Sequence, residues 1–465
     1  MAMDPVLLSR VQFAFVVAFH IIFPTFTIGL SAYIAVLGAL WVRTGQDRFH
    51  QLMRFWTRIF AVSFAMGVVS GIVMSYQFGT NWSHFSHVVG NVVGPLIGYE
   101  VLTAFFLEAT FLGVLLFGFD RVPPWLYVLS GFFVAGGTAF SAFWILSANS
   151  WMQTPAGFVM KDGVAFPTDW LAVIFNPSFP YRFTHMVNAA YLTTGFVVLA
   201  VGARYLLAGR HVEVSRTMLR MAIGLVVILA PLQLFLGDQH GLNTLENQPI
   251  KVAAMEAHWD SNEAGVPFEI FAWPNEKTES NDYSLSVPHG ASLLLTHSWD
   301  GKFKGLKSVP PQDRPPVPIV FFAFRIMVGL GLFMIAAAFV GAFLWWRGTM
   351  FETRWYLWIM SQCWWIGFIA VICGWITTEV GRQPWVVDGV LRTADAASPV
   401  PGDSVITTLI LFVLAYATVF SFGIYYINRL IHRGPEEPTE TSEGLAGAAM
   451  AAAHHTTARS LPRHS

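Results

Sequence analysis

Long apolar stretches separated by short polar links make up most of the chain. Stretches of about 20 or more mostly apolar residues, enough to span a bilayer as a helix, occur near residues 11–42, 55–79, 94–119, 125–149, 183–208, 217–236, 318–346, 355–378 and 404–428. The first is far longer than the apolar core of a signal peptide, so we expect it to remain as a membrane helix. The pattern therefore predicts an all-α polytopic membrane protein with nine transmembrane helices.

One long hydrophilic insert interrupts this pattern between helices six and seven. It starts with turn-like residues at 237–241, continues with a predicted amphipathic helix at 250–259 and ends in a proline-rich, extended segment at 310–316. After Pro435 the chain shows no periodicity, which predicts disorder. The predicted parts are the first six transmembrane helices (1–236), the loop (237–316), the last three helices (317–433) and a tail (434–465).

Composition and the placement of arginines indicate the class and the orientation of the protein. With 55% hydrophobic and 12% charged residues, the chain lies outside the range of soluble globular domains. Its formal charge of −1 and the lack of a basic patch predict no nucleic-acid partner. Every second connection is rich in arginine, whereas the opposite short links hold only Lys161, Arg182, Arg382 and Arg392. The positive-inside rule then places the N-terminus and the long loop outside, and the C-terminus in the cytoplasm.

A carboxylate and a guanidinium lie at the end of the eighth apolar stretch. Glu379 and Arg382 are three residues apart and share a face if the helix continues to Gly381, with Pro384 marking its end. Because an ionised carboxylate in hydrocarbon costs about 2.5–3.5 kcal/mol, Glu379 needs a partner. That partner is either a metal or another cation, or Arg382 itself in an ion pair at the membrane interface.

Two histidines and a methionine lie inside predicted membrane helices. His20 has almost no polar neighbours in the sequence, and His185 opens the fifth stretch. Imidazole and thioether on facing helices form a low-spin haem site, which makes Met327 a candidate partner for His185. Arg325, two residues before Met327, needs an anion, and haem propionates would supply one. The alternatives are a hydrogen-bonded core histidine at His20 and ordinary packing for Met327.

Two carboxylates lie on the third stretch, which contains no lysine or arginine. Glu100 and Glu108 are eight residues apart, which on an α-helix places them within ~80° of each other. Buried carboxylates without a basic partner are either protonated or bound to a cation, and both states suit a proton relay. Ser141 on the fourth stretch is a candidate to extend such a relay. The alternative is a structural role in capping a neighbouring helix.

Lys251 and Glu256 lie in the long loop, where they are candidates to hydrogen-bond the head group of a lipid-borne substrate. The alternative for this pair is a solvated helix face. His84 and His87 are spaced like metal ligands but are expected in a loop, and we assign them no role. Five polar or sulfur-bearing residues from five helices are all expected in the outer half of the bilayer, which favours a metal site: His20, Glu100, His185, Met327 and Glu379.

Several short motifs carry a resemblance to a known family. They are Leu8–Phe13, Gly98–Glu100, Ser150–Gly157, Lys251–Glu256, Arg325–Gly329, Gly374–Trp375 and Gly381–Trp385. Together they resemble subunit I of the cytochrome bd-type quinol oxidases, over nearly all of the chain before its tail. The long loop is of the short kind known in that family and resembles the cyanide-insensitive branch.

The resemblance implies a set of haem ligands. His185 and Met327 resemble the axial ligands of a low-spin haem b. His20 and Glu379 resemble the axial ligands of a pair of high-spin haems, one a haem b and the other a haem d or a third haem b. Which high-spin haem takes His20 stays open.

The resemblance also implies roles for other polar residues. Glu100 resembles an acidic group beside the high-spin pair, and Glu108 a residue of the proton path. Lys251 and Glu256 resemble the loop residues that bind and deprotonate quinol. Two arginines and a tryptophan complete the implied site, as propionate or haem-pair partners and as part of the catalytic set: Arg325, Arg382 and Trp375.

The implied activity is oxidation of ubiquinol or menaquinol at the periplasmic face and reduction of dioxygen to water, with charge separation but no proton pump. The implied location is the bacterial cytoplasmic (inner) membrane. A second membrane subunit is the implied partner, with or without a small single-span subunit. Two alternatives stay open: a haem b electron-transfer cytochrome that does not reduce oxygen, and a proton-coupled transporter without haem.

Overall fold

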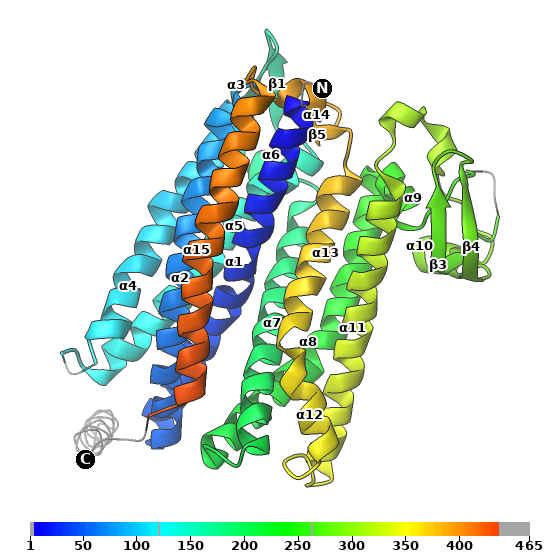
Figure 1. Ribbon diagram of the computed structural model, residues 1–465. Helices are drawn as coiled ribbons and strands as arrows, with labels where there is room; N and C mark the ends of the chain where they lie inside the picture. Colours follow the sequence, from blue (N-terminus) through cyan, green and yellow to red (C-terminus); the bar gives the residue numbers. More distant parts are fainter. Residues whose placement is uncertain (1–3, 120, 262–263, 437–465) are drawn as a thin grey trace, which may run out of the picture.

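The structure is a computed structural model that describes residues 4–119, 121–261 and 264–436. Within these residues, nine helices are long and apolar enough to cross a membrane, which confirms the predicted fold class (Figure 1). Inside a bilayer the backbone must satisfy its own hydrogen bonds, so apolar stretches fold as helices. The membrane-length elements are α1 (Pro5–Thr44), α2 (Asp47–Thr80), α3–η1–α4 (Ser83–Tyr99, Glu100–Phe105, Phe106–Phe117), α5 (Pro124–Gln153), α7 (Phe179–Leu207), α8 (Val212–Asn247), α11 (Val317–Trp346), α12–η4–α13 (Arg354–Gln362, Cys363–Trp365, Ile366–Gly381) and α15 (Gly402–Arg433).

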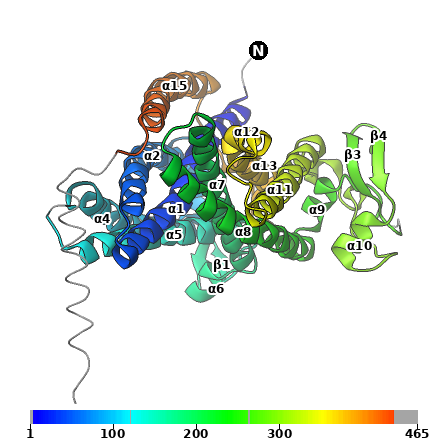
Figure 2. The ribbon, with the colours of Figure 1, turned by 90° about the horizontal axis from the view of Figure 1, so that it is seen from below.

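The helices form one bundle with α7 at its centre. Of the apolar window of α7, 72% is buried inside the protein, against 17% for α15, which lies on the outside of the bundle (Figure 2). α1 approaches α7 closely at Gly29, where an added Cβ would lie 2.4 Å from the Thr194 hydroxyl oxygen. A small residue is therefore needed at this crossing.

Several helices extend beyond the predicted apolar stretches. α8 continues to Asn247, so the turn predicted at 237–241 is wrong and the loop begins about ten residues later than expected. The glycines of this segment do not end the helix, because each costs only about 1 kcal/mol in a helix interior. The extension is also held in place by Asn243, which donates a hydrogen bond to the Pro177 carbonyl oxygen, before α7, at 3.1 Å. α3 begins at Ser83, so His84 and His87 lie on a helix and not in a loop.

The third span changes its winding halfway along. Residues 100–105 form a π-helical segment, η1, between α3 and α4. The angle of ~80° between Glu100 and Glu108 assumed a continuous α-helix, so that estimate is wrong. π-helical segments inside α-helices occur frequently at functional sites.

The long loop is folded. It contains α9 (Pro249–Met255), an antiparallel hairpin of β3 (Phe268–Asn275) and β4 (Ser280–Val287), α10 (Gly290–Thr296) and two 3₁₀ turns, Leu306–Ser308 and Pro311–Asp313. The second turn means that the extended segment predicted at 310–316 is wrong in part. The helix predicted at 250–259 is confirmed only as far as Met255, in α9, which packs against α8, α11 and α13 (Figure 1).

Short elements cover the end of the bundle where α1 begins, which we call the N-terminal end (Figure 1). They are the hairpin of β1 (Phe158–Lys161) and β2 (Val164–Pro167), α6 (Trp170–Ile174), the hairpin of β5 (Trp385–Val387) and β6 (Leu391–Arg392), and α14 (Thr393–Ala396). Apart from residues 434–436, the tail predicted to be disordered lies outside the described residues.

Candidate functional site

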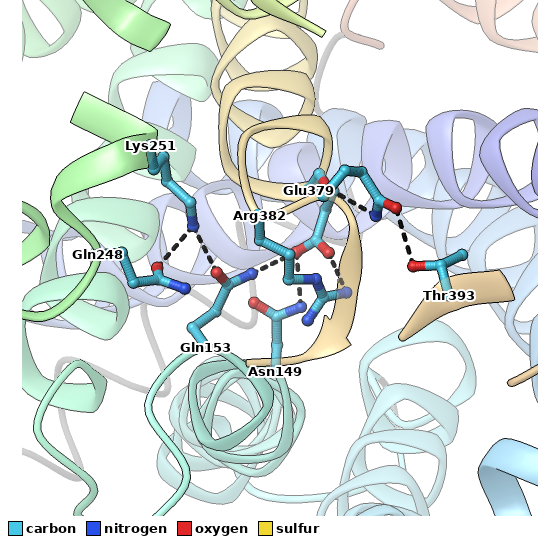
Figure 3. A network of polar contacts seen from close by, with 8 residues as sticks. Asn149, Gln153, Gln248, Lys251, Glu379, Arg382 and Thr393 are labelled. Atoms are coloured by element: carbon cyan, nitrogen blue, oxygen red, sulfur yellow. Dashed lines mark hydrogen bonds and ion pairs between the residues drawn. The ribbon is translucent and has the colours of Figure 1, made fainter. Parts of the chain in front are cut away.

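Glu379 lies in a polar cluster at the N-terminal end, where α13 stops (Figure 3). It forms an ion pair with Arg382, and its Oε1 accepts hydrogen bonds from Asn149 at 2.9 Å and Gln153 at 3.3 Å. The helix continues to Gly381, so the shared face predicted for the charged pair is confirmed. The Arg382 guanidinium keeps Nε and Nη1 buried without a hydrogen-bond partner among the described residues. The cluster is therefore not closed on itself.

Lys251 on α9 joins the same cluster (Figure 3). Its side chain is buried, and its Nζ donates to Gln153 Oε1 at 2.5 Å and to Gln248 Oε1 at 2.7 Å. Gln153 thus bridges Lys251 and Glu379. Burial, and next the charges of Arg182 and Arg382, hold the pKa of Lys251 well below its usual value. The solvated helix face considered for this residue is wrong.

Glu256 follows α9 and faces a different partner. Its carboxylate lies 2.7 Å from Arg325 of α11, and both side chains are buried or nearly so. Arg325 also donates to the Glu269 carbonyl oxygen and lies over the Phe268 and Phe321 rings, at 4.3 and 4.7 Å from the ring centres. The anion beside Arg325 is thus Glu256, while its Nη1 is left without a partner among the described residues.

His185 and Met327 lie on α7 and α11. The His185 ring packs against His240 of α8, with ring centres 5.4 Å apart, and its Nδ1 is buried without a hydrogen-bond partner in the described chain. The Met327 sulfur lies beside Gly374 of α13, where an added Cβ would be 3.0 Å away. Each candidate ligand therefore lies against a neighbouring helix, and their pairing across one haem stays a prediction.

His20 is oriented by a serine on the next helix. Its Nδ1 lies 3.0 Å from Ser70 Oγ, and its ring lies against Gly71, where an added Cβ would be 3.1 Å from Cε1. Such a contact on one ring nitrogen fixes the imidazole and directs the other nitrogen, Nε2, to a metal. Pro24, four residues later, also removes the helical hydrogen bond that the His20 carbonyl would accept.

Glu100 and Glu108 occupy the middle of the bundle. Ser141 of α5 donates a 2.7 Å hydrogen bond to Glu100, as a relay would require. Glu108 is 5% exposed, and its Oε1 has no hydrogen-bond partner among the described residues. Glu100 lies at the midpoint of its 35-residue span, and its predicted place in the outer half of the bilayer stays a prediction. Glu108 lies on α4, which continues the span from η1 away from the N-terminal end (Figure 1).

The space for Glu108 is left by Gly137 of α5. A Cβ at position 137 would lie 2.6 Å from Glu108 Cγ, whereas one at the neighbouring Gly136 would meet nothing within 4 Å. We expect Gly137→Ala to lower stability by about 1–3 kcal/mol, the usual effect of overpacking. Gly136→Ala is the matched control and should be neutral or raise stability by about 0.5–1 kcal/mol. Melting temperatures of the two variants in detergent check this, and equal values would contradict it.

Four functional candidates were missed in the sequence. Arg182 was counted as a loop charge but is buried on α7, three residues before His185. His240 lies in the segment expected to be a turn, and Gln153 lies in a motif that carried no role. The fourth is Asp388, whose carboxyl pKa is raised by burial. Of these, Arg182 could have been found from the sequence. It lies one helical turn from His185 and on the same face, and a charged residue next to a candidate ligand is unusual in a membrane helix.

Residues 8–435, nearly the whole chain, match the model of one protein family, cytochrome bd terminal oxidase subunit I. The chain belongs to this family.

Relatives and a solved structure agree with the family. The cytochrome bd ubiquinol oxidase subunit 1 of Bacillus subtilis (strain 168) is 36% identical over 93% of this chain and 95% of its own length. The cytochrome bd-II ubiquinol oxidase subunit 1 of Escherichia coli (strain K12) is 32% identical over 94% of this chain and 99% of its own. The structure of bd oxidase from Geobacillus thermodenitrificans aligns with a TM-score of 0.86 at 30% identity, over 93% of this chain and 99% of that one.

A cytochrome bd subunit implies haem, and the buried polar groups fit it. His185 Nδ1 and the guanidinium nitrogens named above are buried donors or ligands without partners among the described residues. No group of three or more His, Cys, Asp or Glu that would hold a bare metal ion occurs in the described parts of the chain. Iron at His20 or His185 would therefore need ligands from a macrocycle, and carboxylates of the macrocycle would match the unpaired guanidinium groups. Trp375 is half-buried on α13 and directly follows Gly374, the glycine that lies beside the Met327 sulfur.

Proposed function

We propose that this chain is the haem-carrying subunit of a terminal quinol oxidase of the bacterial inner membrane. In the overall reaction, two quinols give up four electrons and four protons, and one dioxygen becomes two waters. The observation that carries the proposal is the concentration of buried histidine, glutamate, arginine and lysine side chains at the N-terminal end of a nine-helix family member. Hydrocarbon does not tolerate these groups unless they are paired or functional.

Electrons enter through α9. Lys251 and Glu256 bind the quinol head group and accept its protons, and quinol would have to displace their present partners, Gln153 and Arg325. α9 packs against α11 and α13, the helices that carry Met327 and Glu379, and this packing supports the assignment. His185 and Met327 would hold the low-spin haem b, which would supply the first electron acceptor. Ubiquinol and menaquinol both fit these contacts, because the head-group oxygens are alike.

We assign oxygen reduction to the pair of high-spin haems. His20 and Glu379 would hold this pair, which consists of a high-spin haem b and either a haem d or a third haem b. Iron macrocycles supply the one-electron and dioxygen chemistry that protein side chains lack. Asn149, Gln153 and Arg382 hold the Glu379 carboxylate in place, and Ser70 holds the His20 ring. Trp375 and Glu100 complete the surroundings.

Protons for water formation reach the site through Glu108 and then Glu100 with Ser141. Support comes from Glu108, which is buried and lies on α4, the part of the span that runs from η1 away from the N-terminal end. With the N-terminus in the periplasm, protons from quinol are released outside while those consumed come from the cytoplasm. Charge is thereby separated without a pump. A second membrane subunit, with or without a small single-span subunit, completes the complex.

The test uses the purified complex. We expect haem bands in its absorption spectrum, reduction of the low-spin band by quinol and uptake of one oxygen per two quinols. A colourless preparation would contradict the proposal and favour a transporter. Haem reduction without oxygen uptake would also contradict it and favour an electron-transfer cytochrome. Extracted-haem analysis distinguishes haem d from a third haem b.

A further inference from the structure

Arg182 is the buried arginine at the N-terminal end that lacks an anionic partner. Its side chain is 6% exposed, and its Nε is enclosed without a hydrogen-bond partner in the described chain. Two other buried or nearly buried arginines of this region each hold a carboxylate, Arg325 that of Glu256 and Arg382 that of Glu379. Among the described residues, no ion pair or side-chain hydrogen bond of Arg182 is present.

The surroundings of Arg182 add positive charge and not a counter-ion. It lies within electrostatic range of Arg382, which repels it, and of Glu379, which is already paired. Asp388 is a weak source of negative charge because burial raises its pKa. A buried charge that is left without a partner strongly destabilises the folded state. An anion from outside the chain is therefore needed here.

The position of Arg182 on α7 indicates where that anion comes from. Arg182 and His185 are three residues apart and so share a face, with Arg182 one turn nearer the N-terminal end. The two residues are also within electrostatic range of each other. A molecule held by the His185 ring and bearing carboxylates about one helical turn away would satisfy both residues. The chemistry required is that of a propionate-bearing macrocycle.

We infer that the Arg182 guanidinium binds a propionate carboxylate of the haem that His185 ligates, and that its charge raises the reduction potential of this haem. The inference rests on the proposed function, since it takes His185 as an axial ligand. Arg182 is a positioning residue that acts through the haem carboxylate. A fixed positive charge stabilises the reduced haem, which carries one electron more, and so favours electron transfer from quinol.

The test compares three variants of the intact complex. Arg182→Gln removes the charge, Arg182→Lys keeps it without the fork of two donors, and Arg204→Gln is the matched control on the exposed, opposite end of α7. In a redox titration of the low-spin band, Arg182→Gln should reduce the ratio of reduced to oxidised haem at fixed potential by about tenfold or more. Arg182→Lys should restore most of that ratio, and Arg204→Gln should leave it unchanged.

Resonance Raman spectroscopy gives a second readout that survives partial loss of haem. The propionate bending band of the low-spin haem should shift in Arg182→Gln and not in Arg204→Gln. An unshifted band together with an unchanged midpoint potential in Arg182→Gln would overturn the inference. These results are separate from the proposed function, because haem bands and oxygen uptake in the unaltered complex test that function whatever Arg182 does.

Discussion

Met327→Leu is expected to abolish the low-spin haem band while the high-spin bands remain. Leucine has nearly the volume of methionine, so the packing cost should stay below about 1.5 kcal/mol. What is lost is the thioether sulfur, the soft axial ligand that keeps iron low-spin opposite an imidazole. The reduced-minus-oxidised absorption spectrum of the purified complex measures the outcome.

Met334→Leu provides the matched control for this experiment. Met334 lies on the same helix, seven residues further along, and is 5% exposed in the main apolar core. Met334→Leu therefore makes the same change of side chain at a residue that is not a predicted iron ligand. A low-spin band that persists in Met327→Leu, or that disappears equally in both variants, would rule out Met327 as the ligand.

The membrane helices could be predicted because hydrophobicity selects them segment by segment. Their ends could not. A hydropathy window detects the part of a helix inside the bilayer, whereas α8 continues for eleven residues beyond residue 236. These residues include Asp238, Gln239 and Asn243, and Asn243 holds this part of the helix against the chain before α7. His84 and His87 were placed in a loop for the same reason.

The local part of the candidate site was also predictable. Glu379 and Arg382 are three residues apart, so the helical period alone brings them together. The pairing of Glu256 with Arg325 joins positions 69 residues apart through the fold of the long loop, which no local pattern specifies. The bridge from Lys251 through Gln153 to Glu379 likewise needs three separate elements, α9, α5 and α13.

That bridge links the proposed quinol site to the proposed oxygen-reducing site. The Gln153 amide oxygen accepts a hydrogen bond from Lys251, and the amide nitrogen donates one to Glu379. If the amide were flipped by about 180°, its NH2 group would face the Lys251 donor and its oxygen would face the Glu379 carboxylate, so both hydrogen bonds would be lost. A quinol that draws Lys251 away would leave the Gln153 oxygen without its donor. The two sites are thus connected by one side chain in the described part of the protein, which fixes Lys251 in a defined position before quinol arrives.

Lys251→Met is expected to raise the apparent KM for quinol by about 10- to 100-fold, with haem content unchanged. Leaving a buried polar group without its hydrogen-bond partner costs about 1–3 kcal/mol, and each 1.4 kcal/mol is tenfold in affinity. Methionine keeps the aliphatic stem that packs on Gly381, where an added Cβ would lie 2.9 Å from Lys251 Cγ. The variant therefore removes the side-chain nitrogen without leaving a cavity. Steady-state oxygen uptake at varied quinol concentration measures KM, and Lys304→Met, an exposed lysine of the same loop, is the control. If both variants keep the KM of the unaltered complex, Lys251 supports the loop and does not bind quinol.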